Sequence, residues 1–185
     1  MGSKPQTPRL GRVTTAASLR PPQNRVSRRA VWMWTVRSAI GVLFMLALIG
    51  GASWAVGFFA WSWVPAPVVD HVWALPALYA CYGVAKTIIA PRWRYRVHRW
   101  EVTADVVYTR VGWLSRSWQL VPVGRIQTVD HTQGWLERMF RLATLEVQTA
   151  SHAGSSTIEG LEEPEAQRIS EELAARAGDL RDDAT

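Results

Sequence analysis

The chain is poor in the residues that build covalent or metal-bound frameworks. Among its 185 residues there is one cysteine, Cys81, so neither an internal disulfide framework nor a multi-cysteine metal site can form within one chain. There are four histidines: His71, His98, His131 and His152. None of them is spaced to another histidine, to Cys81 or to a carboxylate in a metal-ligand pattern. We therefore predict no metal site and interpret Cys81 as a small packing residue.

Signatures of catalysis are also missing. The sequence has no glycine-rich phosphate loop, no G-x-S-x-G motif and no pair of carboxylates in a recognisable cleft. Asp130 and His131 are adjacent, so in a strand their side chains point to opposite faces and cannot act as a pair. The glutamates of residues 162–172 are interpreted as a solvated helix face. We predict that the protein is not an enzyme and has no cofactor.

Charge is absent from two long stretches. Residues 38–69 carry no charged side chain, and residues 72–90 carry only one, that of Lys86. A bilayer core of about 30 Å is crossed by about 20 apolar residues in a helix. The sequence therefore predicts a two-helix transmembrane hairpin over residues 35–91, with spans at about 38–61 and 70–90.

Acidic residues are absent before Asp70, whereas residues 1–37 hold eight basic ones. A second basic cluster lies in residues 91–99, at the other flank of the apolar runs. We expect six arginines of these two clusters to fix the orientation of the hairpin in the membrane. They are Arg28, Arg29, Arg37, Arg92, Arg94 and Arg96. Because basic residues favour the cytoplasmic side, both termini are predicted to be cytoplasmic. The richness in Arg, Ala and Trp suggests a bacterial source, and hence a bacterial cell membrane. This explanation of the pI of about 10.2 is favoured over nucleic-acid binding.

The remaining boundaries follow from composition. Residues 1–34 are rich in Pro, Ser, Thr, Gln and Arg and are predicted to be a disordered basic cytoplasmic tail, and residues 179–185 a polar tail. Six tryptophans are expected at the membrane interfaces, where indole rings are favoured. They are Trp32, Trp34, Trp61, Trp63, Trp73 and Trp93.

Each predicted span carries small residues at four-residue spacing. They are Ala47, Gly51 and Ala55 in the first span, and Ala77, Cys81 and Ala85 in the second. Small residues let helix backbones approach closely in lipid. The two stripes either face each other within one hairpin or mediate oligomerisation, and chance is a serious alternative to both.

Residues 92–178 are predicted to form an α+β cytoplasmic domain. Short runs rich in Val, Ile, Thr and aromatics, separated by turn residues, predict antiparallel strands. They cover residues 97–102, 106–111, 117–121, 125–132 and 143–150, with 156–158 as one more short strand. A helical turn or two is expected at 135–140. A last helix should begin at Pro164, stop at Gly178 and cap the sheet with one apolar face. That face consists of Ala166, Ile169, Leu173 and Ala177.

Three stretches carry a family resemblance. They are VPVGRIQTVD at 121–130, QGWLERMF at 133–140 and LATLEVQTA at 142–150, with IEGL at 158–161 in support. Together they resemble the signature of the YdbS-like bacterial PH-domain membrane proteins (PH-like domain, type 2). The resemblance implies a PH-like antiparallel barrel or sandwich with a C-terminal capping helix, joined to a hairpin, and it brings no catalytic residues. Arg141 stands where this family usually has a glycine.

The polar residues of this signature are candidate interaction residues. They are Arg125, Gln127, Asp130 and Gln133, next to Gly134. Either they bind a ligand, or they satisfy one another and nearby backbone groups. We favour the second interpretation, because buried polar groups in a small barrel need partners.

Three functional hypotheses remain open. The leading one is a membrane-anchored interaction or scaffold module on the cytoplasmic face, which binds an unidentified protein partner or another copy of itself and modulates a membrane assembly. The alternative is a sensor of anionic lipid at the membrane surface. A transporter subunit or an enzyme is less favoured. The charge distribution separates the first two, because residues 100–185 have a net charge of about −6 and lack a basic pocket of their own.

Overall fold

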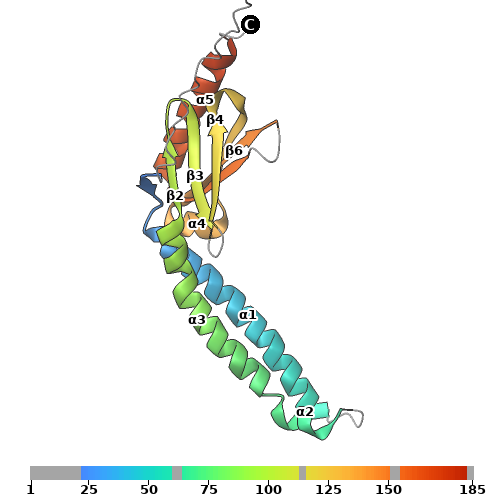
Figure 1. The fold of residues 1–185 in the computed structure, drawn as a ribbon. Helices are drawn as coiled ribbons and strands as arrows, with labels where there is room; N and C mark the ends of the chain where they lie inside the picture. The colour runs from blue at the N-terminus through green and yellow to red at the C-terminus, as the bar shows by residue number, and fades with distance from the viewer. Residues whose placement is uncertain (1–21, 60–63, 113–115, 151–154, 183–185) are drawn as a thin grey trace, which may run out of the picture.

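A computed structural model describes residues 22–59, 64–112, 116–150 and 155–182. Figure 1 shows a long helical hairpin with a strand-rich domain at one end. The hairpin consists of α1 (Arg29–Phe59) and α3 (Ala74–Val97), with the short α2 (Ala66–His71) at the end remote from the domain. Both α1 and the segment Ala66–Val97 are long and apolar enough to cross a membrane.

The two long helices pack through a narrow seam of small and hydroxyl residues. A Cβ added at Gly83 would collide with Val42, so this glycine marks a close approach of α3 to α1. At one end of the seam, Ser38 Oγ lies 3.3 Å from Thr87 Oγ1. At the other, Ser53 Oγ donates to the Val72 carbonyl at 3.2 Å. Each hydroxyl thus has a partner, as an apolar surrounding requires.

The small residues at four-residue spacing do not form this seam. Ala47, Gly51, Ala77, Cys81 and Ala85 are exposed on the hairpin, and Ala55 is half-buried. The contact between the two helices instead uses a different side of each one. That side contains Val42 and Ser53 on α1, and Gly83 and Thr87 on α3. Packing of the two stripes against each other is therefore not what holds this hairpin together.

The domain contains two antiparallel sheets. The first has the order β1-β2-β3-β4, and the second has the order β5-β6-β7. Their strands are β1 (Asn24–Arg25), β2 (Arg99–Val102), β3 (Val106–Gly112), β4 (Arg116–Pro122), β5 (Ile126–Thr132), β6 (Leu142–Thr149) and β7 (Ser156–Glu162). A short 3-10 turn, η1 (Val123–Arg125), joins the sheets. The predicted strands agree to within about two residues, except that β7 extends well beyond residue 158.

Two helices complete the domain. α4 (Trp135–Phe140) connects β5 to β6, and α5 (Glu163–Asp182) follows β7. The predicted apolar face of α5 is buried, with Ala166 and Leu173 fully enclosed. This helix does not stop at Gly178 as expected but continues for one more turn. An exposed helical glycine weakens a helix without forcing it to end.

The residue after α4 shows why a glycine is usual there. Arg141 has φ 54° and ψ 45°, the left-handed conformation that glycine adopts without cost. A non-glycine residue adopts it at a cost of about 1–2 kcal/mol. Its carbonyl accepts from the backbone N–H of Glu163 at 3.3 Å, which ties this turn to the start of α5.

The predicted disordered tail is wrong for residues 24–34. β1 pairs with β2, with Asn24 opposite Trp100. Ala30, Met33 and Trp34 are buried in the same hydrophobic core as the strands of the domain. The reason is helical spacing, since these side chains share one face of an α1 that begins at Arg29, well before the uncharged run. Residues 1–21 and 183–185, also predicted to be tails, lie outside the described residues.

The other domain boundary also differs from the prediction. α3 continues through Pro91 to Val97, so its last two turns belong to the domain and not to a span that ends at residue 90. We call this region, residues 26–38 and 90–98, the joint. Gly160 of β7 lies against it with φ +80°, and a Cβ there would lie 2.7 Å from the Ala30 Cβ. The Gly160 carbonyl accepts from Ser27 N at 2.9 Å.

Candidate functional site

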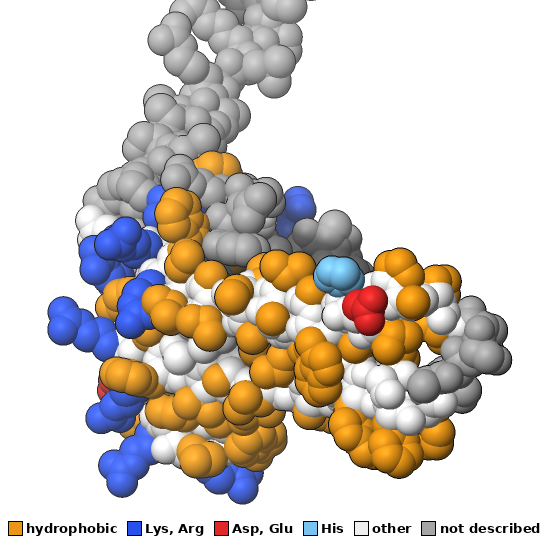
Figure 2. Space-filling model, turned by 90° about the horizontal axis from the view of Figure 1, so that it is seen from below, with side chains coloured by type: hydrophobic (Ala, Val, Ile, Leu, Met, Phe, Trp, Pro, Cys, Tyr) orange, Lys and Arg blue, Asp and Glu red, His pale blue; other side chains and the backbone are white. Residues whose placement is uncertain are grey.

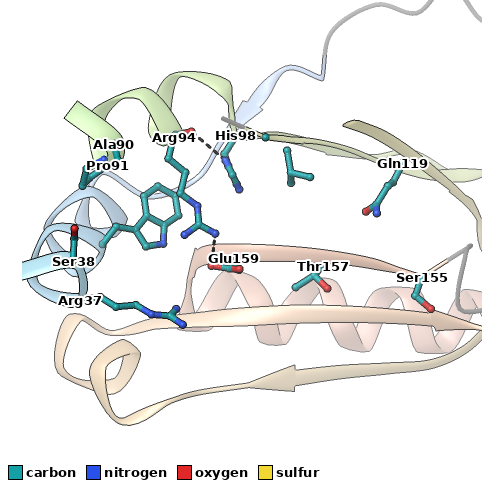
Figure 3. Close-up of a pocket in the computed structure, with 13 residues that line it drawn as sticks. Arg37, Ser38, Ala90, Pro91, Arg94, His98, Gln119, Ser155, Thr157 and Glu159 are labelled. Atoms are coloured by element: carbon teal, nitrogen blue, oxygen red, sulfur yellow. Dashed lines mark hydrogen bonds and ion pairs between the residues drawn. The ribbon is translucent and has the colours of Figure 1, made fainter. Parts of the chain in front are cut away.

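The joint borders an open cavity of about 580 Å³ between the hairpin and the two sheets. Figure 3 shows its lining, which comes from α1, α3 and the facing edges of β3–β4 and β7. The residues are Trp34, Arg37, Ser38, Ala90, Pro91, Arg94, His98, Val111, Gly112, Gln119, Ser155, Thr157 and Glu159. The hairpin therefore supplies both arginines, and the domain supplies the carboxylate and most of the hydroxyl and amide groups.

Arg94 is the residue that ties the two parts together at the cavity. Its Nη2 donates to Glu159 Oε2 at 2.8 Å, as the dashed line in Figure 3 shows. The guanidinium also lies over the Trp34 ring, with Cζ 4.4 Å from the ring centroid. Stacking and pairing together hold the side chain in one place, so Arg94 joins α3 to α1 and to β7.

Trp34 is 4% exposed, and its indole Nε1 finds no hydrogen-bond partner in the part of the chain that the structure describes. A buried N–H without an acceptor costs about 1–3 kcal/mol. Arg37, one helical turn further on, is exposed and lines the same cavity. The cavity wall thus combines the edge of a buried indole ring with an exposed cationic side chain.

His98 closes the cavity beside Arg94. Its Nδ1 lies 3.1 Å from the Arg94 carbonyl, and its ring packs 5.4 Å from the Trp34 ring. Burial, and then the positive charge of Arg94, lower the pKa of His98 from 6.5 to about 4. His98 is therefore neutral near pH 7. The two arginines and Glu159 then leave the cavity with a net charge of about +1.

A second cavity of about 440 Å³ lies between α1 and α4. It shares Arg37, Thr157 and Glu159 with the first, so Arg37 lies between the two cavities. Met33, Ile40, Trp135 and Leu136 give it an apolar wall. Glu137 and Glu146 also line it, which makes this cavity more acidic than the first.

The signature residues are not gathered in either cavity. Gln133 Nε2 donates to the Leu142 carbonyl at 2.8 Å, and Gly134 N donates to Glu137 Oε2 at 2.8 Å. These two bonds hold the start of α4. Arg125, Gln127 and Asp130 are exposed along η1 and β5. Of the five, only Gly134 lines one of these two cavities.

The predicted membrane-flanking residues do lie together. Figure 2 shows the Lys and Arg side chains at one end of the hairpin, whose shaft is covered by hydrophobic side chains. Arg28, Arg29, Arg37, Arg92 and Arg96 are exposed, whereas Arg94 is half-buried in its ion pair. Trp32, Trp73 and Trp93 are exposed as interface residues should be. Trp34 is not, because the core of the domain encloses it, and Trp61 and Trp63 lie outside the described residues.

Sequence reasoning missed the role of Trp34, Arg94 and Glu159. A signal was available for the first, because Val26, Ala30, Met33 and Trp34 follow helical spacing upstream of the uncharged run. No local sequence pattern predicts the Arg94–Glu159 pair, because its members are 65 residues apart. Within the described ranges, no group of three or more His, Cys, Asp or Glu side chains could hold a metal ion.

Comparison with known proteins supports this architecture. Residues 35–177 match the family model described as bacterial PH domain. The chain is also 28% identical over 165 residues to the UPF0699 transmembrane protein YdbS of Bacillus subtilis, which covers 88% of this chain and 97% of that protein. No solved structure gives a significant match. With two apolar helices and a transmembrane relative, this is a membrane protein, and the chain belongs to the bacterial PH domain family.

Proposed function

We propose that this protein is a membrane-anchored interaction module, whose PH-like domain serves as a scaffold on the cytoplasmic face within a membrane protein assembly. The observation that carries the proposal is the joint. Ala30, Met33 and Trp34 of α1 are built into the domain core, so the domain has one fixed orientation relative to the hairpin. A fixed orientation presents the same surfaces to every neighbour in the membrane, as a scaffold requires.

The cytoplasmic placement rests on charge. Because α1 and α3 are antiparallel, residues 29 and 97 lie at the same end of the hairpin, next to the domain. Among the described residues of the two basic clusters, Arg28, Arg29, Arg37, Arg92 and Arg96 are exposed, and Figure 2 shows Lys and Arg side chains gathered at this end. The positive-inside rule assigns such an end to the cytoplasm. Two crossings, with both termini on that side, follow from this assignment.

The strand β4 offers the best surface for a protein partner. It is an edge strand of its sheet, with Trp118 49% and Leu120 50% exposed. Edge strands with exposed apolar side chains are natural sites for partner binding. The domain is otherwise acidic, and the exposed glutamates of α5 would repel an anionic membrane surface.

A photo-crosslinking amino acid at position 120 in native membranes tests the scaffold role. We expect a discrete crosslinked protein product at Leu120 that is absent when the same group replaces Thr128, an exposed residue of β5. The same product at both positions, or no protein product at position 120, would contradict a partner on β4.

A second candidate function is recognition of an anionic lipid headgroup in the cavity at the joint. The acidic charge of residues 100–185 argued against it, but the cavity takes Arg37 and Arg94 from the hairpin instead. Arg37, which is exposed on the cavity wall, is a suitable donor to a phosphate.

Thermal unfolding of the purified full chain separates this function from general charge attraction. Phosphatidylglycerol, compared with phosphatidylcholine, should raise the unfolding midpoint of the wild type and of Arg92→Gln, but not of Arg37→Gln. Arg92 is a matched control because it is exposed and does not line the cavity. Equal shifts in both variants would leave the headgroup site without support.

A further inference from the structure

We propose that α4 is a third membrane contact, in which Trp135 and Met139 enter the boundary between headgroups and acyl chains beside the basic end of the hairpin. This contact goes beyond the anchoring by α1 and α3, because it belongs to the PH-like domain itself. The partner of α4 is the lipid surface of the leaflet that surrounds the basic end of the hairpin.

The first observation is the exposure of α4. Trp135 is 67% and Met139 70% exposed, more than any other large apolar side chain described in residues 99–182. The opposite side of the helix is occupied, since Leu136 is buried and Glu137 accepts hydrogen bonds from Gly134 N and Thr144 Oγ1. α4 is therefore a fixed, short amphipathic element whose apolar side has no partner within the described chain.

The second observation is depth. Trp135 lines the same cavity as Arg37 and Ile40 of α1. Arg37 is the last charged residue before the run of residues 38–69, and Ile40 already lies within that run. Trp135 is thus level with the point where the hairpin passes from charged to apolar. Indole rings favour this level of a bilayer.

The third observation is the charge around α4. Arg138 and Arg141 are exposed on and just after the helix, and Arg37 lies across the cavity. Basic side chains are attracted to an anionic leaflet, so Arg138 and Arg141 favour lipid over water at this surface. Within the cavity, Glu137 of α4, Glu146 of β6 and Glu159 of β7 outnumber Arg37, so the attraction to an anionic leaflet comes from the exposed Arg138 and Arg141.

Continuity with the hairpin favours lipid as the occupant over a soluble protein. α4 packs beside α1, and Figure 1 places it at the end of the domain that faces the hairpin. Any bilayer that surrounds the apolar part of α1 also reaches α4. With α4 seated in the leaflet, the domain is held at two separate places and cannot swing away from the membrane.

A fluorescent probe at position 139 tests the contact in the full chain. Met139→Cys in a Cys81→Ser background is labelled with an environment-sensitive fluorophore and placed in nanodiscs of phosphatidylcholine and phosphatidylglycerol. Leu180→Cys is the matched control, because Leu180 is 49% exposed in the last turns of α5, at the opposite end of the domain. Trp135→Cys provides a second labelling position should the first variant fold poorly.

We expect blue-shifted emission at position 139 and quenching by lipids spin-labelled at acyl carbon 5 that is several-fold stronger than at position 180. Equal emission and equal quenching at the two positions would overturn the proposal. Blue-shifted emission without quenching by the spin-labelled lipids would also overturn it, because another protein or a second copy would then cover α4.

Discussion

The two halves of α1 lie in different surroundings although they form one continuous helix. In the first turns, Ala30, Met33 and Trp34 are at most 4% exposed, because the domain core encloses them. Further along, Leu43 and Phe44 are 64% and 65% exposed. The basic half of the helix is the buried one, and the apolar half is the one that the protein leaves uncovered. Only a bilayer around the second half makes this arrangement reasonable.

This difference assigns two roles to α1: its outer half anchors the protein in the membrane, and its inner half is part of the folded domain. The outer half of α1 can be described by hydropathy alone, because its side chains need only an apolar solvent. The inner half has specific contacts, namely Trp34 with Arg94 and His98, and Ala30 with Gly160. The hairpin is therefore part of the domain's core at one end and an anchor at the other, and substitutions at the two ends should behave differently.

The largest effect is expected for Trp34→Ala. Removal of a buried tryptophan from a core costs about 3–5 kcal/mol, through lost burial and the cavity left behind. Trp32→Ala is the matched control, because Trp32 is 68% exposed on the same turn of helix. Thermal unfolding in detergent should show a large decrease in the midpoint for the first variant and little change for the second. Equal effects would remove the distinction between the two sides of α1.

The second-largest loss of stability is expected for Gly160→Ala. The new Cβ meets Ala30, and the φ of +80° is unfavourable for alanine, so we expect a loss of about 1–3 kcal/mol in the free energy of unfolding. Gly178→Ala is the control, because nothing lies within 4 Å of its Cβ position and the residue is helical. That change should stabilise the domain by up to about 1 kcal/mol. A neutral Gly160→Ala would contradict the close approach at the joint.

Acid should weaken the joint through His98. Its pKa of about 4 in the folded state lies below the unfolded value of 6.5, so the unfolded chain binds more protons between these values. The stabilisation is present above pH 6.5 and is lost as the pH falls toward 4, by about 2 kcal/mol between pH 7 and pH 5. Denaturation at several pH values should show this slope, and His98→Gln should flatten it. An unchanged slope in the variant would assign the effect to other groups.

The smallest effect is expected for the Arg94–Glu159 pair. Each side chain is 32% exposed, so water screens the pair and its coupling energy should be about 1 kcal/mol or less. Arg94→Gln should cost more than Glu159→Gln, because Arg94 also stacks on Trp34. A double-mutant cycle measures the coupling, and Arg168→Gln with Glu172→Gln, an exposed pair within α5, provides the comparison. Coupling no larger than in that pair would mean that Arg94 acts through stacking alone.

Sequence patterns predicted the parts of the molecule that depend on local or periodic signals. The apolar runs, the strands of residues 99–149 and the buried face of α5 all have such signals, and the structure contains them. The joint was missed because its contacts connect residues far apart, such as Ser27 with Gly160 and Arg94 with Glu159. Trp34 was assigned to the membrane interface because a tryptophan next to an apolar run satisfies that pattern and the core pattern equally well.

Hydrogen exchange on the full chain in nanodiscs tests the central claim most directly, with Leu145→Asp as the perturbation. Leu145 is fully buried in β6, and a charge there should unfold the domain. If the first turns of α1 are part of the domain's core, residues 26–34 should lose protection together with the strands, whereas residues 42–55 keep it. Retained protection of residues 26–34 beside an unfolded domain would show that the hairpin folds independently and would contradict the account.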